Sequence, residues 1–184
     1  TRFHCANHKR HGAQTVTQAL ENSCNQSFIQ IGARLGKEAF CDYFEAFGLC
    51  APTGIDLPNE TRWTSVYNAQ QMAEVDTNLY TAAFGQNEAI TPMQMATAIA
   101  AIANGGIYTK PVFFTKILDH NGKVLLENEP QTKRVLKDST AFLLTDALAE
   151  SMESSRMYAS PGVNLNSTSV PANIPGMSNA GKSG

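Results

Sequence analysis

Residues 91–106, TPMQMATAIAAIANGG, carry the clearest structural signal in the chain. Thr91 can cap a helix, Pro92 suits the first helical position, and Gln94 completes a capping box with Thr91. Apolar residues then recur at helical spacing until Asn104-Gly105-Gly106, a sequence that typically ends a helix. Because its many alanines allow close approach to a neighbour, we expect this stretch to form a buried helix. The methionines at positions 93 and 95 are predicted to be packing residues.

Two short helices joined by a turn are predicted upstream, between residues 15 and 36. Thr15 and Gln18 form another capping box, and residues 21–25, ENSCN, are poor in helix formers. After this turn, apolar residues recur at i, i+3 and i+7, which predicts a core-facing stripe of Phe28, Ile31 and Leu35. A third helix is predicted from Lys37 to Phe47, and its core face is formed by Phe40, Phe44 and Phe47.

A β-hairpin is predicted downstream, around residues 111–126. Its turn is Asp119-His120-Asn121-Gly122, and Asn-Gly between apolar β-formers favours a tight connection. A short helix is expected at about 69–73, and an amphipathic helix from Asp138 to about Met152. The inward side of that amphipathic helix is predicted to consist of Phe142, Leu143, Ala147 and Leu148. Residues 159–181 are rich in Ser, Pro, Asn and Gly and are predicted to form a loop.

The composition excludes several classes of protein. The 184 residues are 42% hydrophobic and 16% charged, which suits a packed core and not a disordered chain. The net charge of −2 and the lack of a long basic run give no sign of a nucleic-acid partner. No stretch of about 18 apolar residues is present, so no membrane span is expected. Because the sequence does not begin with Met, we expect it to be a piece of something longer.

Four cysteines stand at positions 5, 24, 41 and 50, with no Cys-x-x-Cys pair and no Cys/His zinc pattern. Their even number permits two disulfides in three connectivities, although free, partly buried thiols are favoured. His4, Cys5, His8 and His11 lie near one another, but their spacing is irregular. We therefore expect no metal and no cofactor.

Two short polar motifs stand far apart, Ser23-Cys24-Asn25 and Lys182-Ser183-Gly184. Each alone is a weak signal, because Ser-x-Asn is often an ordinary polar turn and a final Lys-Ser-Gly is often a solvated tail. Only folding can bring them together.

With their surroundings, these motifs resemble the transpeptidase domain of penicillin-binding proteins. Residues 16–25 are similar to the segment around the family's second motif, and residues 54–60, GIDLPNE, to its Gly-Ile-Asp-Leu-Pro-x-Glu segment. Residues 81–96 are similar to its Gly-Gln and Thr-Pro-x-Gln-x-Ala block, and residues 180–184, AGKSG, to its third motif, usually Lys-Thr-Gly. The landmarks occur in the family's order from about His11 onward and look most like the monofunctional, class B enzymes.

The resemblance implies an α+β fold: a mostly helical fragment of the penicillin-binding protein/serine β-lactamase-like transpeptidase fold, with the β-hairpin around 111–126. The family's nucleophile belongs to a Ser-x-x-Lys motif, and no serine in this sequence has lysine three positions later. Residues 1–184 are therefore expected to be a partial domain that lacks the upstream Ser-x-x-Lys segment and the downstream sheet strands. We expect this fragment to be inactive alone.

The resemblance also implies roles for the two motifs. Ser23 would pass protons towards the leaving amine, and Asn25 would hold the substrate amide. Lys182 would supply positive charge beside Ser23. Ser183 and Gly184 would bind the substrate, and Ser183 would hydrogen-bond the substrate carboxylate. Acyl transfer needs these elements together with an activated serine and donors for the oxyanion.

The function implied for the full-length protein is a peptidoglycan D,D-transpeptidase that cross-links peptide stems and is acylated by β-lactams. It would act at the extracytoplasmic face of the bacterial cell membrane, anchored by a segment outside this chain, with other cell-wall synthesis proteins as partners. Self-association of the fragment is expected where an apolar face is uncovered. Two alternatives are a β-lactamase or β-lactam-sensor domain of the same fold, and a non-catalytic interaction module.

Overall fold

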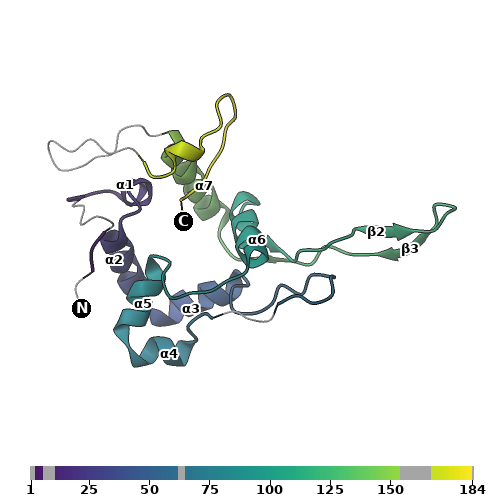
Figure 1. The fold of residues 1–184 in the computed structure, drawn as a ribbon, viewed down its shortest axis with the longest axis horizontal. Coiled ribbons are helices and arrows are strands. Elements are labelled where there is room, and N and C mark those ends of the chain that lie inside the picture. The colour runs from purple at the N-terminus through teal and green to yellow at the C-terminus, as the bar shows by residue number, and fades with distance from the viewer. Residues whose placement is uncertain (1–2, 6–10, 62–64, 154–166, 184) are drawn as a thin grey trace. The chain divides into compact units, whose positions relative to one another are not determined.

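A computed structural model describes residues 3–5, 11–61, 65–153 and 167–183, and Figure 1 shows their helices and strands. The chain divides into two compact units. The first comprises Thr1–Cys41, Tyr67–Glu88 and Phe142–Gly184, and the second comprises Asp42–Val66 and Ala89–Ala141. None of the described helices combines the length and apolar character that crossing a bilayer requires.

The described part of the first unit is helical. It contains α1 (Val16–Glu21), α2 (Asn25–Leu35), α4 (Ala69–Glu74), α5 (Asp76–Ala83), the first part of α3 (Lys37–Ala46), most of α7 (Asp138–Glu153) and the 3-10 helix η2 (Val170–Ala172). The predicted pair of helices with a turn at 21–25 is confirmed, as are the helices expected at 37–47, 69–73 and from Asp138. Helix α5 has no counterpart among the sequence predictions.

The close packing of α2 against α5 depends on Gly32. A Cβ atom at this position would lie 2.7 Å from the Cβ of Ala83, so only glycine permits this approach of the two helices. Next to the crossing lies a small buried cluster of Met72, Leu79 and Ala82, packed by the partly buried Phe40, Cys41, Tyr67 and Tyr80. The predicted aromatic face of α3 therefore contributes to a core through Phe40, although the helix has no fully buried residue.

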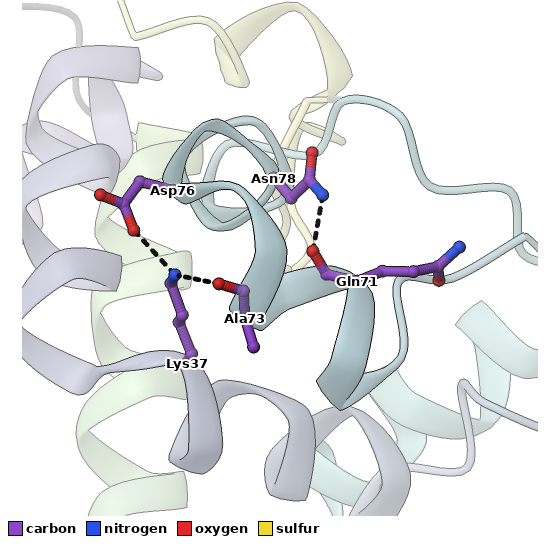
Figure 2. Close-up of polar contacts among 5 residues, drawn as sticks. All are labelled: Lys37, Gln71, Ala73, Asp76 and Asn78. Carbon is purple, nitrogen blue, oxygen red and sulfur yellow. Dashed lines mark hydrogen bonds and ion pairs between the residues drawn. The ribbon is translucent and has the colours of Figure 1, made fainter.

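Polar contacts tie the start of α3 to the junction between α4 and α5 (Figure 2). Lys37 Nζ lies 2.7 Å from the Asp76 carboxylate and donates to the carbonyl of Ala73 at 3.2 Å. Asn78 Nδ2 donates to the carbonyl of Gln71 at 2.8 Å. An exposed ion pair contributes only about 0–1 kcal/mol, so these contacts set the angle between the helices more than they stabilise them.

The second unit contains α6 (Pro92–Ala103) and two antiparallel strand pairs. The pairing of β2 (Lys116–Leu118) with β3 (Val124–Glu127) confirms the predicted hairpin. The pairing of β1 (Ile107–Thr109) with β4 (Thr132–Arg134) is not predicted by the sequence. Figure 1 shows β2 and β3 at the far end of an extended arm. Gly122 adopts a left-handed φ of 81° in the turn, a conformation that glycine accepts without strain.

Gln94 fixes the start of α6 and the loop that follows α3. The capping box is present: Thr91 Oγ1 accepts from the Gln94 N–H at 3.1 Å, and Gln94 Oε1 accepts from the Thr91 N–H at 2.8 Å. The Gln94 Nε2 group donates to the carbonyls of Leu49 at 3.2 Å and Ala51 at 2.7 Å. Because the side chain is only 1% exposed, water does not replace these bonds when they are lost.

Several residues predicted to face a core are instead exposed, and those predictions were wrong. They are Ile31 and Leu35 in α2, Met93, Met95 and Ile99 in α6, and Phe142 and Leu143 in α7, where Phe142 reaches 71% exposure. Helical spacing identifies the apolar side of a helix, but burial also needs a second element against that side. In α6 the packed side is the one that carries Gln94, Thr97, Ala98 and Ala101.

Glu88 is a partly buried carboxylate at the end of the 67–88 segment. Its Oε2 accepts from the Tyr67 N–H at 3.2 Å, and its Oε1 is buried without a hydrogen-bond partner among the described residues. Burial raises the pKa of Glu88 to about 7, against the lowering effect of the Tyr67 hydrogen bond. The folded chain therefore holds this proton through mildly acidic conditions.

Replacing Gln94 by alanine should destabilise the chain more than replacing a glutamine whose side chain only caps its helix. Gln94→Ala loses the cap and removes the donor to the carbonyls of Leu49 and Ala51, for an expected cost of about 2–3 kcal/mol. The matched control is Gln71→Ala in α4, where Gln71 caps with Asn68 but is exposed, and the expected cost is below about 1 kcal/mol. Urea unfolding of both variants measures the difference, and equal costs would show that the bridging bonds contribute nothing.

Glu88→Gln should remove a pH dependence of stability. Between the unfolded pKa of 4.5 and the folded pKa of about 7, the folded chain binds more protons than the unfolded chain. The free energy of unfolding should therefore fall as the pH rises through this range. Since the side chain is partly exposed, we expect a fall of about 1 kcal/mol. Urea unfolding at about pH 5 and about pH 8 measures it, with the exposed Glu74→Gln as control, and an unchanged slope in Glu88→Gln would contradict the assignment.

Candidate active site

Ser23 lies on the turn between α1 and α2, and the backbone of that turn is unusual. Ser23 adopts a φ of 48°, in the left-handed region that non-glycine residues rarely occupy. Its N–H donates to the carbonyl of Leu20 at 3.1 Å, and the N–H of Cys24 donates to that of Ala19 at 3.0 Å. The flanking Asn22 and Cys24 are buried, at 5% and 3% exposure. Packing on both sides therefore holds the Ser23 backbone in a conformation that the residue alone would avoid, and this fixes the position of its hydroxyl.

Lys182 reaches Ser23 from the other end of the chain. Its Nζ donates to Ser23 Oγ at 2.9 Å, across a separation of 159 residues, and to Ser183 Oγ at 3.1 Å. It also donates to the carbonyl of Ser183 at 2.6 Å. Burial lowers the pKa of Lys182 below the ordinary value of a lysine. A lysine with a lowered pKa gives up its proton more readily, so this pair is suited to proton transfer through the serine hydroxyl.

Ser183 is held by two residues of the segment that precedes η2. Its hydroxyl donates to Thr168 Oγ1 at 2.7 Å, and its N–H donates to Ser169 Oγ at 3.1 Å. The same segment is attached to the end of α1, because the Thr168 N–H donates to the carbonyl of Glu21 at 3.1 Å. These contacts make one continuous hydrogen-bonded path from α1 to the Lys182-Ser183 pair.

Helix α7 contacts this path at Gly181, the residue before Lys182. The Ser151 side chain, which is 0% exposed, donates to the carbonyls of Leu148 at 2.9 Å and Gly181 at 2.7 Å. Gly181 also lies against Met152, whose Sδ would be 3.0 Å from a Cβ at that position. The hydrogen bond from Ser151 therefore holds Gly181 in place, and the absence of a side chain lets Gly181 pack closely against Met152.

The structure brings together only some of the residues that the sequence predicts. Ser23, Lys182 and Ser183 converge. Asn25 begins α2, and its side-chain amide donates to the carbonyl of His4 at 3.2 Å. Gly184 lies outside the described residues.

The sequence patterns did not identify Ser151, Ser167, Thr168 or Ser169 as site residues. Residues 167–169 lie in a stretch whose Ser-rich composition predicts only a loop. No local pattern connects them with Glu21, which lies almost the whole chain length away, and only the fold makes that connection.

A cavity of about 480 Å³ adjoins the site in the first unit, lined by residues that include Thr168, Ser169, Lys182 and Ser183. A second cavity, of about 730 Å³ and equally open to solvent, lies in the second unit, lined by Pro52, Gly54, Ile55, Leu57, Asn59 and Glu60. Although that cavity is larger, its one titratable lining residue, Glu60, is occupied by hydrogen bonds from Thr53 and Gly54. The cavity beside Lys182 is therefore the better candidate for substrate.

The sequence matches a known protein family over nearly its whole length. The family model of the penicillin-binding protein transpeptidase domain matches residues 2–184. The chain belongs to this family. The transpeptidase-domain chain is 31% identical over 183 residues to stage V sporulation protein D of Bacillus subtilis (strain 168), and the match covers 100% of the chain and 26% of that protein.

Solved transpeptidase structures share the fold. The structure of penicillin-binding protein 3 from Mycobacterium tuberculosis in complex with aztreonam has a TM-score of 0.76 and 26% identity, over 88% of this chain and 34% of that one. The D,D-transpeptidase domain of a peptidoglycan glycosyltransferase from Eggerthella lenta has a TM-score of 0.75 and 25% identity, over 96% of this chain and 42% of that one. The transpeptidase-domain chain thus spans well under half the length of the proteins it resembles.

Proposed function

We propose that the chain is part of a peptidoglycan D,D-transpeptidase, which cross-links cell-wall peptide stems by serine acyl transfer and is acylated by β-lactams. The supporting observation is the 2.9 Å contact from Lys182 Nζ to Ser23 Oγ, because it joins two family motifs from opposite ends of the chain. The similar structure from Mycobacterium tuberculosis is a complex with a β-lactam, aztreonam.

Each residue of the site has a role in this reaction. The proton that the serine nucleophile loses passes through the Ser23 hydroxyl to the leaving amine of the D-alanyl-D-alanine stem, and the positive charge of Lys182 beside Ser23 assists this transfer. Its charge, with the Ser183 hydroxyl, binds the terminal carboxylate of the substrate. Asn25 holds the substrate amide, which requires its side chain to exchange the carbonyl of His4 for the substrate. Gly184 binds the substrate together with Ser183.

The serine nucleophile is not among these residues, because none of the serines has lysine three positions later. We infer that it belongs to a Ser-x-x-Lys segment outside residues 1–184 and that this chain alone does not catalyse acyl transfer. The full-length protein is proposed to act at the extracytoplasmic face of the cell membrane through an anchor outside this chain, with other cell-wall synthesis proteins.

Incubation with benzylpenicillin should acylate only a longer form of the protein. We expect one penicillin mass on a form continued through the Ser-x-x-Lys segment and past Gly184, and none on residues 1–184. In the longer form, Lys182→Met should slow acylation by at least about 100-fold, because it removes both the hydrogen bond to Ser23 and the positive charge. Intact mass against time measures the rate.

The matched control is Lys123→Met, since Lys123 is exposed in the hairpin arm, and its acylation rate should equal that of the unsubstituted form. Acylation of residues 1–184 alone would contradict the assignment of the nucleophile and would direct attention to Ser23. A stable fold in the longer form without any acylation would contradict the transpeptidase function itself.

The isolated chain is proposed to self-associate, because apolar side chains of α6 and α7 are exposed, including Phe142 and Leu143. Exposed apolar surface costs about 25 cal/mol per Å², which favours its burial against a second copy. Sedimentation velocity at increasing concentration should show dimers. A monomer at every concentration would contradict this proposal.

A further inference from the structure

Three side chains with metal-binding atoms meet behind the Ser23 turn. Cys24 is the N-cap residue of α2, and Cys5 and His11 come from the segment that precedes α1. All three are buried, at 3%, 6% and 7% exposure. One sulfur or nitrogen atom of each lies within 4.8 Å of the others. Two cysteines and a histidine converging in a buried place are the donor set of many zinc sites.

The distance between the two sulfur atoms fits a shared metal ion. Cys5 Sγ lies 3.5 Å from Cys24 Sγ. Two thiolates bound to one tetrahedral zinc ion at about 2.3 Å each lie about 3.8 Å apart, whereas a disulfide needs about 2.05 Å. Only a small adjustment of the two side chains is needed to admit the ion.

We propose that Cys5, His11 and Cys24 bind a zinc ion, which attaches the segment before α1 to the turn that carries Ser23. Thiolate and imidazole ligands together favour zinc over magnesium or calcium. The attachment has a structural counterpart already, because Asn25 and Gln26 donate to the carbonyls of His4 and Phe3, both at 3.2 Å. The fourth position of a tetrahedral ion is completed by water or by one further ligand.

The proposed role of the ion is to stabilise the site. The Ser23 conformation is costly for a non-glycine residue, and it persists only while its neighbours are held in place. A zinc ion on Cys24 fixes the residue next to Ser23 more firmly than a thiol–thiol contact does. The inference does not depend on the transpeptidase reaction, since it concerns metal content and fold stability.

The first measurement is the zinc content of the full chain purified without chelator from cells grown with added zinc. Inductively coupled plasma mass spectrometry should find one zinc ion per chain. X-ray absorption at the zinc edge should show two sulfur neighbours at about 2.3 Å and at least one imidazole nitrogen at about 2.0 Å. Because this measurement uses the unsubstituted chain, it remains decisive if a variant fails to fold.

Substitutions then identify the ligands. Cys5→Ser, Cys24→Ser and His11→Ala should each lose the bound zinc and lower the unfolding temperature. The matched controls are Cys50→Ser and His120→Ala, which alter exposed residues of the second unit and should keep one zinc per chain. Adding a chelator should lower the unfolding temperature of the unsubstituted chain and of both controls, but not of the three ligand variants.

A count of thiols separates zinc binding from oxidation. After denaturation without reductant, four reactive thiols with one zinc released per chain support the metal site. Two reactive thiols, located by peptide mapping at Cys41 and Cys50, would show that Cys5 and Cys24 form a disulfide, and this would overturn the proposal. A chain without zinc, or a zinc ion without sulfur neighbours, would overturn it equally.

Discussion

The hydrogen bond from Lys182 to Ser23 is the contact on which the arrangement of the site depends. Moving an ammonium group out of water is unfavourable unless its donors are satisfied, and Lys182 uses them on the Ser23 hydroxyl and on the carbonyl and hydroxyl of Ser183. All of these partners are neutral. The positive charge of Lys182 is therefore solvated by dipoles without being neutralised by them, and it remains available to an anionic group that enters the adjoining cavity.

The supports of this contact come from three separate parts of the chain. The Ser23 backbone is held by α1 and the buried Cys24, the carbonyl of Gly181 before Lys182 by Ser151 on α7, and the Ser183 side chain by Thr168. Thr168 lies in the segment before η2. Because each support is a short, directed hydrogen bond or a close packing contact, the two motifs are positioned by rigid elements and not by their own sequence.

Local signals predicted the local structure well. The capping boxes at Thr15 and Thr91 and the Asn-Gly turn before Lys123 each specify a backbone conformation within a few residues, and the structure contains all three features. Burial was predicted poorly, as the exposed Phe142 shows, because it depends on an opposing element that periodicity does not reveal. The pairing of β1 with β4 was missed for the same reason, since neither three-residue strand carries an alternating pattern of its own.

Residues 23–25 show most clearly which features of the site the sequence predicts and which only the fold shows. Resemblance assigns chemistry to Ser23 and Asn25 and leaves Cys24 as a spacer. The fold makes Cys24 the most deeply buried of the three, in contact with a cysteine 19 residues away. Ser23 and Asn25 are partly exposed, whereas Cys24 between them is buried in the protein. What it meets there determines how firmly the two functional residues are held, which is why the spacer has as much bearing on the site as its neighbours.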